Sequence, residues 1–234
     1  MPFDKMLMLI LRNWLVFSVL AMIVAATSAL LVFIKVAGEV IEGDTGKIDL
    51  LILMWLRVTA DPSDPVGPVW LEDFARDITA LGSPAVLGLF VLIATFFLIL
   101  IGQRFFALFM LISTVGGTYV VTILKEVFGR SRPNLIPDGM YVYSASFPSG
   151  HAMLSAVVYL TLGALIARLV PSIALKLYVM AIAVILTGLV GLSRVYLGVH
   201  WPSDVLAGWA AGAAWALGGG AVAQSIRLGS VRQQ

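Results

Sequence analysis

The chain contains only two histidines, His151 and His200, and each lies in a short polar segment beside long apolar stretches. His200 is followed four residues later by Asp204. One helical turn at the start of the next apolar stretch would therefore bring the carboxylate to the imidazole. A carboxylate bound to one ring nitrogen fixes the tautomer and leaves the other nitrogen free to attack an electrophile. The spacing predicts a nucleophilic histidine at position 200, oriented by Asp204.

Basic residues gather in the same polar segments as the histidines. The segment KEVFGRSRP (125–133) and the segment SRVYLGVHWPSD (193–204) together carry Lys125, Arg130, Arg132 and Arg194. Arginine forks match the oxygens of a phosphate group. Ionisable groups near a bilayer are costly and are functional candidates for that reason. We therefore predict a site for a phosphate-like anion, although a single cation at the end of a span more often snorkels to the headgroups.

The segment FPSGH (147–151) has the pattern of a helix start. Ser149 and Gly150 come directly before a long apolar stretch, and His151 follows them. The free N–H groups and the dipole at a helix N-terminus attract an anion, and a glycine there allows the backbone to approach the anion closely. This segment is the third predicted part of the anion site.

Each of these residues also has a purely structural explanation. Ser149 could serve only as an N-cap, Asp204 only as a first-turn acid that complements the helix dipole, and a histidine only as a polar cap. Such explanations would have to hold at once for four cations and both histidines on one face. A shared site explains the grouping with one cause.

The composition indicates a membrane protein. Hydrophobic residues make up 60% of the chain and charged residues 12%, with a mean hydropathy of +1.01, whereas soluble domains are about half apolar and a quarter charged. The net charge of +2 and the lack of a basic stripe with interleaved aromatic residues argue against nucleic-acid binding. Cysteine is absent, which excludes disulfides and thiolate metal sites.

Apolar segments of roughly 20 residues predict membrane-spanning helices. We expect an all-α integral membrane protein, a single domain over residues 1–234, with six spans at 14–36, 85–101, 105–124, 151–168, 173–192 and 205–223. Period-2 alternation is absent, which argues against strands. No small-residue cleavage site follows a short apolar core near the start, so we expect no removable signal peptide.

The segment between the first two spans is expected to lie in the membrane interface. Residues 48–58 are too few to cross, and residues 70–81 place several apolar side chains on one face, so both segments are predicted to be interfacial helices. The turn-rich sequence 61–68 separates them. In the last span, Gly208 and Gly212 form a GxxxG step that predicts close helix packing.

Span counting predicts the topology. With six spans, both termini share one side and all three polar clusters meet on the other. Basic residues in short loops mark the cytoplasmic side, so we expect cytoplasmic termini, an extracytoplasmic site and a multi-pass protein of the plasma (inner) membrane.

The three clusters resemble the three signature motifs of the type 2 phosphatidic acid phosphatase superfamily, specifically its membrane-integrated lipid phosphate phosphatases. The pattern K-x6-R-P is met by Lys125, Arg132 and Pro133, and P-S-G-H by residues 148–151. The pattern S-R-x5-H-x3-D is met by Ser193, Arg194, His200 and Asp204.

The resemblance implies a role for each matching residue. It implies that His200 is the nucleophile that becomes phosphohistidine, that Asp204 orients it and that His151 protonates the leaving oxygen. The implied phosphate-binding residues are Lys125, Arg132, Ser149, Gly150 and Arg194. Arg130 and Ser193 are additional candidates, for which an interfacial role is an equal alternative. The family mechanism uses no metal or other cofactor.

The resemblance predicts dephosphorylation of a membrane lipid phosphate or diphosphate, such as polyprenyl diphosphate, phosphatidylglycerol phosphate, phosphatidic acid or a lipid A phosphate. The partners implied are this lipid and the bilayer, with no nucleic acid and no obligatory protein partner. One alternative is a transporter of phosphorylated lipids or anions, which would place ionisable residues at mid-span. Another is an intramembrane serine hydrolase built on Ser149 and a histidine, against which the dense cations argue.

Overall fold

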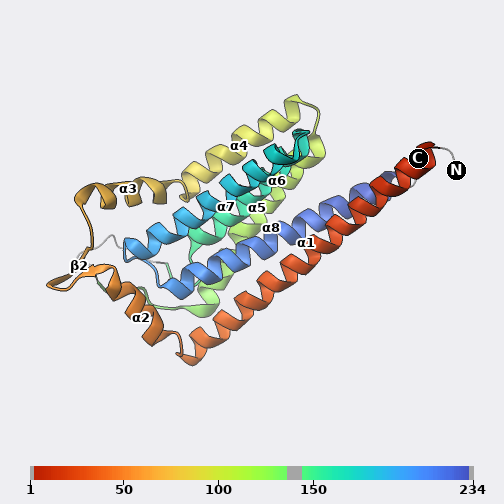
Figure 1. The fold of residues 1–234 in the computed structure, drawn as a ribbon. Helices are drawn as coiled ribbons and strands as arrows, with labels where there is room; N and C mark the ends of the chain where they lie inside the picture. Colours follow the sequence, from red (N-terminus) through yellow and green to blue (C-terminus); the bar gives the residue numbers. More distant parts are fainter. Residues whose placement is uncertain (1–2, 136–143, 232–234) are drawn as a thin grey trace.

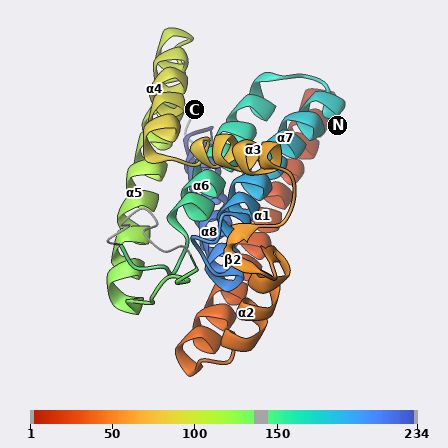
Figure 2. The same ribbon diagram turned by 90° about the vertical axis from the view of Figure 1, so that its left-hand side faces the viewer.

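The computed structural model describes residues 3–135 and 144–231, and their side chains over 15–135 and 144–227. The described chain is mostly helical, and its long helices run roughly alongside one another (Figures 1 and 2). The helices are α1 (Phe3–Glu42), α2 (Gly46–Trp55), α3 (Val69–Ala80), α4 (Pro84–Leu100), α5 (Arg104–Phe128), α6 (Gly150–Leu169), α7 (Ile173–Tyr196) and α8 (Pro202–Val231).

The chain is a multi-pass membrane protein, as its composition predicts. Among the described residues, five helices are long and apolar enough to span a bilayer, namely α1, α5, α6, α7 and α8. Helix α4 has 17 residues and passes the same test only together with α3, from which it is bent by 48°. The predicted second span therefore corresponds to α4, which is shorter than the other spans. Helix α3, which precedes it, lies at the end of the bundle (Figure 1).

Helix α6 forms the centre of the bundle. In its most apolar stretch 61% of the residues are buried, against 6% in α1 and 17% in α7. The exposed faces of the outer helices carry large apolar side chains such as Phe17, Leu92 and Leu177, as expected for surfaces that face lipid. The elements around the site are thus fixed to a helix that is itself rigidly packed.

Helices α1, α5, α7 and α8 extend further than the apolar stretches predict, and in α5 and α7 the additional residues belong to the polar clusters. Helix α5 continues to Phe128 and α7 continues to Tyr196, and each ends near a glycine with positive φ, Gly129 (54°) and Gly198 (71°). Glycine tolerates this conformation without a Cβ clash. Arg194 consequently lies in the last turn of α7, not on a connector as the apolar pattern suggested. Hydropathy marks the apolar layer, whereas helical hydrogen bonding continues past it.

The segment between α2 and α3 differs from the sequence expectation. The predicted helix over 48–58 ends at Trp55, and strand β1 (Arg57–Val58) pairs antiparallel with β2 (Asp61–Pro65). The turn-rich sequence thus forms a small irregular hairpin. The hairpin is attached to the end of α7, because Arg57 Nη2 donates to the carbonyl of Tyr196 at 2.7 Å and the Tyr196 hydroxyl donates to the carbonyl of Val66 at 2.9 Å.

The GxxxG step of α8 packs against α6, as predicted. A Cβ at Gly208 would lie 2.7 Å from the carbonyl oxygen of Ser149, and one at Gly212 would lie 2.4 Å from that of Met153. Both distances are too short for any side chain, so the missing Cβ atoms allow the two backbones to approach each other.

We expect Gly212→Ala to destabilise the protein, because the new methyl group meets backbone that cannot move without separating α6 from α8. Overpacking of this kind typically costs about 1–3 kcal/mol. Thermal unfolding in detergent measures the effect. Gly218→Ala on the same helix is the matched control, since a Cβ there has nothing within 4 Å. Equal melting temperatures for the two variants would contradict the packing argument.

Candidate active site

The three polar clusters meet at one end of the bundle, beside α3 and the hairpin, and the chain termini lie at the other end (Figure 1). A cavity of about 1170 Å³ opens there between the ends of the helices. The sequence-predicted residues that line it are Lys125, Arg132, Gly150, His151, Arg194 and His200. Three of the predicted cations and both histidines therefore share one cavity, which Arg57 and Arg76 also line.

His200 and Asp204 are paired at the start of α8. The His200 Nδ1 atom lies 3.3 Å from Asp204 Oδ2, and both side chains are almost completely buried. The same carboxylate oxygen accepts the Trp201 backbone N–H at 3.0 Å and the Ser146 hydroxyl. The other ring nitrogen, Nε2, lies 3.0 Å from Nη1 of Arg132. With Nδ1 carrying the proton for Asp204, Nε2 keeps its lone pair.

Burial lowers the pKa of His200 to about 4, although the hydrogen bond and the charge of Asp204 act in the opposite direction. The positive charges of Arg132 and Arg194 lower it further. The ring is therefore neutral near pH 7, which is the state a nucleophilic imidazole requires.

Arg132 connects the first polar cluster to the third. Its Nη1 donates to the carbonyl of Val199 at 2.8 Å, while Nε and Nη2 donate to the carbonyl and hydroxyl oxygens of Ser144 at 3.1 and 3.2 Å. Burial lowers the pKa of Arg132, and the charge of Asp204 partly offsets this effect. The guanidinium is thus held next to the free nitrogen of His200.

Lys125 and Arg194 complete the cationic wall. Lys125 Nζ donates to the carbonyl of Ala145, and its Cε would lie 3.6 Å from a Cβ at Gly150. Arg194 Nη1 donates to Thr79 Oγ1 of α3 at 3.0 Å, and its Nε is buried without a partner among the described residues. Neither cation forms an ion pair within the described part of the chain. The cavity can therefore accept an anion.

The start of α6 follows the sequence prediction. Ser149 is the N-cap residue, and its hydroxyl accepts the Ala152 N–H at 3.5 Å. Ser149 is fully buried and does not line the cavity, and its N–H donates to the carbonyl of Asp204 at 2.9 Å. Gly150 and His151 lie in the first helical turn, where N–H groups have no carbonyl partner within the helix.

Two predicted candidates point away from the cavity. The Ser193 hydroxyl donates to the carbonyl of Val190 in its own helix at 2.7 Å. Arg130 binds carboxylates instead, with Nη1 at 2.6 Å from Asp204 Oδ1 and Nη2 at 2.8 Å from Asp49 Oδ2. The Ser193 hydroxyl thus bonds the backbone of its own helix, and Arg130 binds the carboxylate of Asp204, which pairs with His200.

Several residues near the site were not predicted from the sequence. Ser146 bonds Asp204 directly, Thr79 holds Arg194, and Asp49 binds Arg130. A signal existed for Asp49, because it is the only acid in the apolar sequence IDLLILMW (48–55), and a lone acid near a bilayer is a functional candidate. Ser146 and Thr79 give no comparable signal, since serine and threonine are common at helix and loop surfaces.

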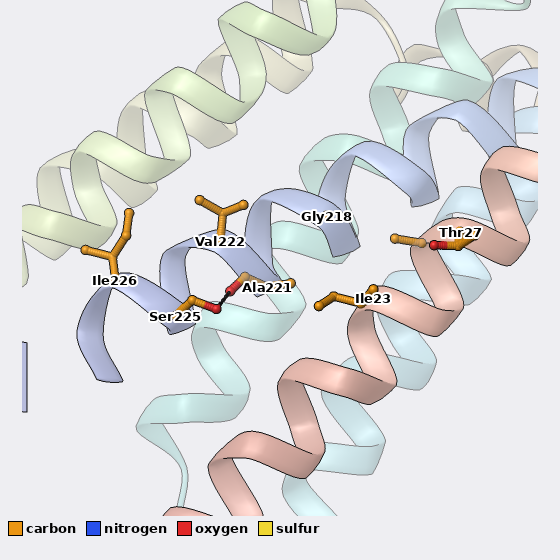
Figure 3. A pocket seen from close by; sticks show the side chains of 8 residues that line it. Ile23, Thr27, Gly218, Ala221, Val222, Ser225 and Ile226 are labelled. Atoms are coloured by element: carbon orange, nitrogen blue, oxygen red, sulfur yellow. Dashed lines mark hydrogen bonds between the residues drawn. The ribbon is translucent and has the colours of Figure 1, made fainter. Parts of the chain in front are cut away.

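A second cavity, of about 320 Å³, lies between α1 and α8, away from the polar clusters (Figure 3). Among the residues whose side chains the structure describes, its lining is mostly apolar, with side chains such as Ile23, Val222 and Ile226, and contains no ionisable group. The only polar side chains in it are Thr27 and Ser225, and Ser225 bonds the carbonyl of Ala221 at 2.9 Å. This lining offers nothing that would bind a phosphate.

The pKa of His200 predicts how its ring behaves in acid. Because the folded-state pKa, about 4, lies below the ordinary 6.5, the folded ring stays neutral between these values while the unfolded chain binds a proton. The neutral His200 ring therefore makes its full contribution to the free energy of unfolding above pH 6.5. This contribution decreases as the pH falls from 6.5 toward 4. Nitrogen NMR on protein labelled at histidine measures the ring directly, and His151→Gln identifies which of the two signals is His200. A midpoint near 6.5 for His200 would contradict the effect of burial.

Comparison with known proteins places the chain in a family. The sequence model of the PAP2 superfamily matches residues 106–224, about half of the chain and all three polar clusters. Phosphatidylglycerophosphatase B of Bacillus subtilis (strain 168) is 35% identical over 144 residues, which are 61% of this chain and 70% of that protein. Undecaprenyl-diphosphatase of Sulfolobus acidocaldarius is 33% identical over 108 residues, 44% of this chain but only 48% of that relative.

A solved structure agrees with the sequence relatives. The crystal structure of a transmembrane PAP2-type phosphatidylglycerolphosphate phosphatase from Bacillus subtilis matches with a TM-score of 0.77 and 28% sequence identity. The match covers 86% of this chain and 96% of that one, so it extends well beyond the range of the family model. The chain belongs to the PAP2 superfamily and is a membrane enzyme that hydrolyses phosphoric esters or diphosphates of lipids.

Proposed function

We propose that the enzyme dephosphorylates a membrane lipid phosphate or diphosphate through a phosphohistidine at His200, without a metal ion. The observation that carries the proposal is the position of His200. Its Nδ1 is bonded to a buried carboxylate, and its ring lines a cavity together with Lys125, Arg132 and Arg194, with Nε2 3.0 Å from Nη1 of Arg132. Phosphoryl transfer depends mainly on positioning and charge stabilisation, and this arrangement supplies both.

In the first step, Nε2 of His200 attacks phosphorus and the bond from phosphorus to the lipid oxygen breaks. His151, at the start of α6 in the same cavity, donates a proton to the departing oxygen. The Nδ1 proton stays on the ring, and Asp204 stabilises the positive charge that the ring acquires. The products of this step are the dephosphorylated lipid and N-phosphohistidine.

In the second step, water attacks the phosphorus of phosphohistidine. His151, now neutral, takes a proton from this water, and the bond between nitrogen and phosphorus breaks. Inorganic phosphate leaves, neutral His200 is restored, and His151 is again protonated for the next cycle. One histidine therefore acts as acid and then as base, so no further proton carrier is needed.

The cations stabilise the charge on the transferring group. Arg132 is already 3.0 Å from Nε2, so its fork lies where the oxygens of the phosphoryl group must pass. Lys125 and Arg194 line the same wall, and Gly150 leaves room for the anion next to the backbone N–H groups of α6. Such donors are most effective where they bind the transition state more strongly than the substrate.

The substrate class follows from the location of the cavity and from the relatives. The relatives are named for phosphatidylglycerophosphate and undecaprenyl diphosphate, which share a phosphate group on a lipid at the membrane surface. The cavity lies at the end of the spans and is lined by Pro84, Val121 and Leu154 as well as by the cations. The cations can bind a phosphate headgroup, and the apolar side chains can contact the first part of a lipid chain.

We also propose the orientation of the enzyme in the plasma membrane. The termini and the connector between α6 and α7 would be cytoplasmic, and the cavity would open at the extracytoplasmic surface. Basic residues near the termini and in short loops, including Arg12, Arg104, Lys176 and Arg227, support this orientation.

Trapping of the phosphoenzyme tests the mechanism. Rapid acid-free quench with a phosphate-labelled lipid in the presence of EDTA should give acid-labile, base-stable label on the wild type and none on His200→Ala. His151→Ala should lose about 10²–10⁴-fold in rate on an alkyl phosphomonoester, the usual contribution of a general acid. It should lose much less on a nitrophenyl ester, whose leaving group needs little protonation.

Two results would contradict the mechanism. Label on His200→Ala together with its loss from His151→Ala would exchange the two roles. Complete loss of turnover in EDTA, restored by magnesium, would replace the mechanism with a metal-dependent one.

Single cysteines test the orientation, because the chain has none of its own. Asp44→Cys lies in the exposed turn between α1 and α2, and Ser172→Cys lies in the exposed connector between α6 and α7. In intact cells a membrane-impermeant thiol reagent should modify the cysteine at 44, and the one at 172 only after lysis. The reverse pattern would invert the proposed orientation.

A further inference from the structure

A buried carboxylate outside the range of the family model is connected to the catalytic pair. Asp49 lies in the first turn of α2, and only 2% of its surface is exposed. The neighbouring Ile48, Leu50 and Leu51 on the same helix are exposed. The inward face of helix α2 thus carries Asp49 and, one turn later, the fully buried Leu53, so a carboxylate is buried on a helix whose exposed side chains are mostly apolar.

The inward carboxylate has two sets of partners. Asp49 Oδ1 accepts the backbone N–H of Ser203 at 2.9 Å, and Oδ2 accepts the Ser203 hydroxyl at 2.6 Å. Oδ2 also accepts Nη2 of Arg130 at 2.8 Å, and Thr45 Oγ1 lies 3.2 Å from the same nitrogen. Asp49 therefore binds both the residue before Asp204 and the arginine that binds Asp204.

Arg130 transmits this contact to the site. Its Nη1 donates to Asp204 Oδ1 at 2.6 Å and to Ser203 Oγ at 2.7 Å. A guanidinium is planar and rigid, so when Nη2 is held by Asp49 and Thr45, the position of Nη1 is determined as well. That position fixes the rotation of the Asp204 carboxylate and so the direction in which Oδ2 points, toward Nδ1 of His200 at 3.3 Å.

We infer that Asp49 is a positioning residue for phosphoryl transfer, which acts through Arg130 to keep Asp204 aligned with His200. The inference rests on the proposed roles of His200 and Asp204. Asp49 does not line the cavity, so it is not expected to contact substrate. Its loss should lower kcat, which depends on the alignment of the nucleophile, and leave KM nearly unchanged.

The test compares Asp49→Asn with Asp44→Asn in the full-length protein. Asp49→Asn keeps the shape and removes the charge that binds Arg130. Asp44 lies five residues earlier and is exposed, so its change to asparagine is a matched control for the loss of one acid. Misalignment of a catalytic group commonly costs about 10–100-fold, and we expect a loss of kcat in this range for Asp49→Asn, with wild-type kcat for Asp44→Asn.

A second readout separates positioning from simple attachment of α2 to the bundle. Nitrogen NMR on histidine-labelled protein reports the tautomer of His200 and its Nδ1–H bond. The spectrum of Asp49→Asn is recorded below the melting temperature of that variant, where the protein is folded. Under these conditions we expect a weaker Nδ1–H bond at His200 or a mixture of its tautomers. A variant that is folded yet has the wild-type His200 signal and wild-type kcat would overturn the inference.

The path through Arg130 is tested by a double-mutant cycle. If Asp49 acts through Arg130, then Asp49→Asn added to Arg130→Lys should lower kcat little beyond Arg130→Lys alone, since neighbours in one network are not additive. Fully additive losses would show that Asp49 acts independently and would overturn the proposed path. The NMR readout does not depend on turnover, so a failure to find phosphohistidine on the wild type would refute the proposed function without deciding the role of Asp49.

Discussion

Asp204, through its buried carboxylate and its backbone carbonyl, is the contact point of all three polar clusters. Its Oδ1 binds Arg130 of the first cluster, and its Oδ2 binds His200 and accepts the Ser146 hydroxyl that precedes the second. The backbone carbonyl of the same residue accepts the N–H of Ser149 at 2.9 Å. A carboxylate that is 0% exposed needs such partners, because an unpaired buried charge is costly. Satisfying this one charge therefore brings the catalytic segments together.

The charges at the site are divided between two environments. Arg130 is paired with carboxylates behind the histidine, whereas Lys125, Arg132 and Arg194 line the cavity with carbonyl or hydroxyl partners. Carbonyl dipoles orient a cation without neutralising it. The cavity therefore keeps a positive potential suited to a phosphate, while the interior behind it is closer to electrical balance.

The elements before residue 106 contact and support the half of the chain that matches the family model. The family model begins at 106, yet α2 supplies Asp49, α3 supplies Thr79 to Arg194, and the hairpin supplies Arg57 to the end of α7. Gly82, at the bend between α3 and α4, lies so close that a Cβ there would be 3.3 Å from Cδ2 of His151. The first half of the chain thus forms part of the wall of the cavity and supports several of its residues.

Local patterns in the sequence were sufficient to predict most of the helices and part of the candidate site. The apolar stretches predicted the spans, the four-residue spacing predicted the contact of His200 with Asp204, and the serine–glycine step predicted the start of α6. Each of these depends on helix periodicity or on a bilayer thickness, which act over a few residues or one span.

Tertiary structure alone decided where the remaining side chains point. Arg130 turned toward Asp49, 81 residues earlier in the chain, and Ser193 turned into its own helix. Residues 57–65 form a hairpin, and Tyr196 at the end of α7 bonds both Arg57 and Val66, the residue after the hairpin. These contacts join segments far apart in the sequence, and no local periodicity encodes them. They depend on which buried charges and N–H groups are left to be satisfied once the helices have packed.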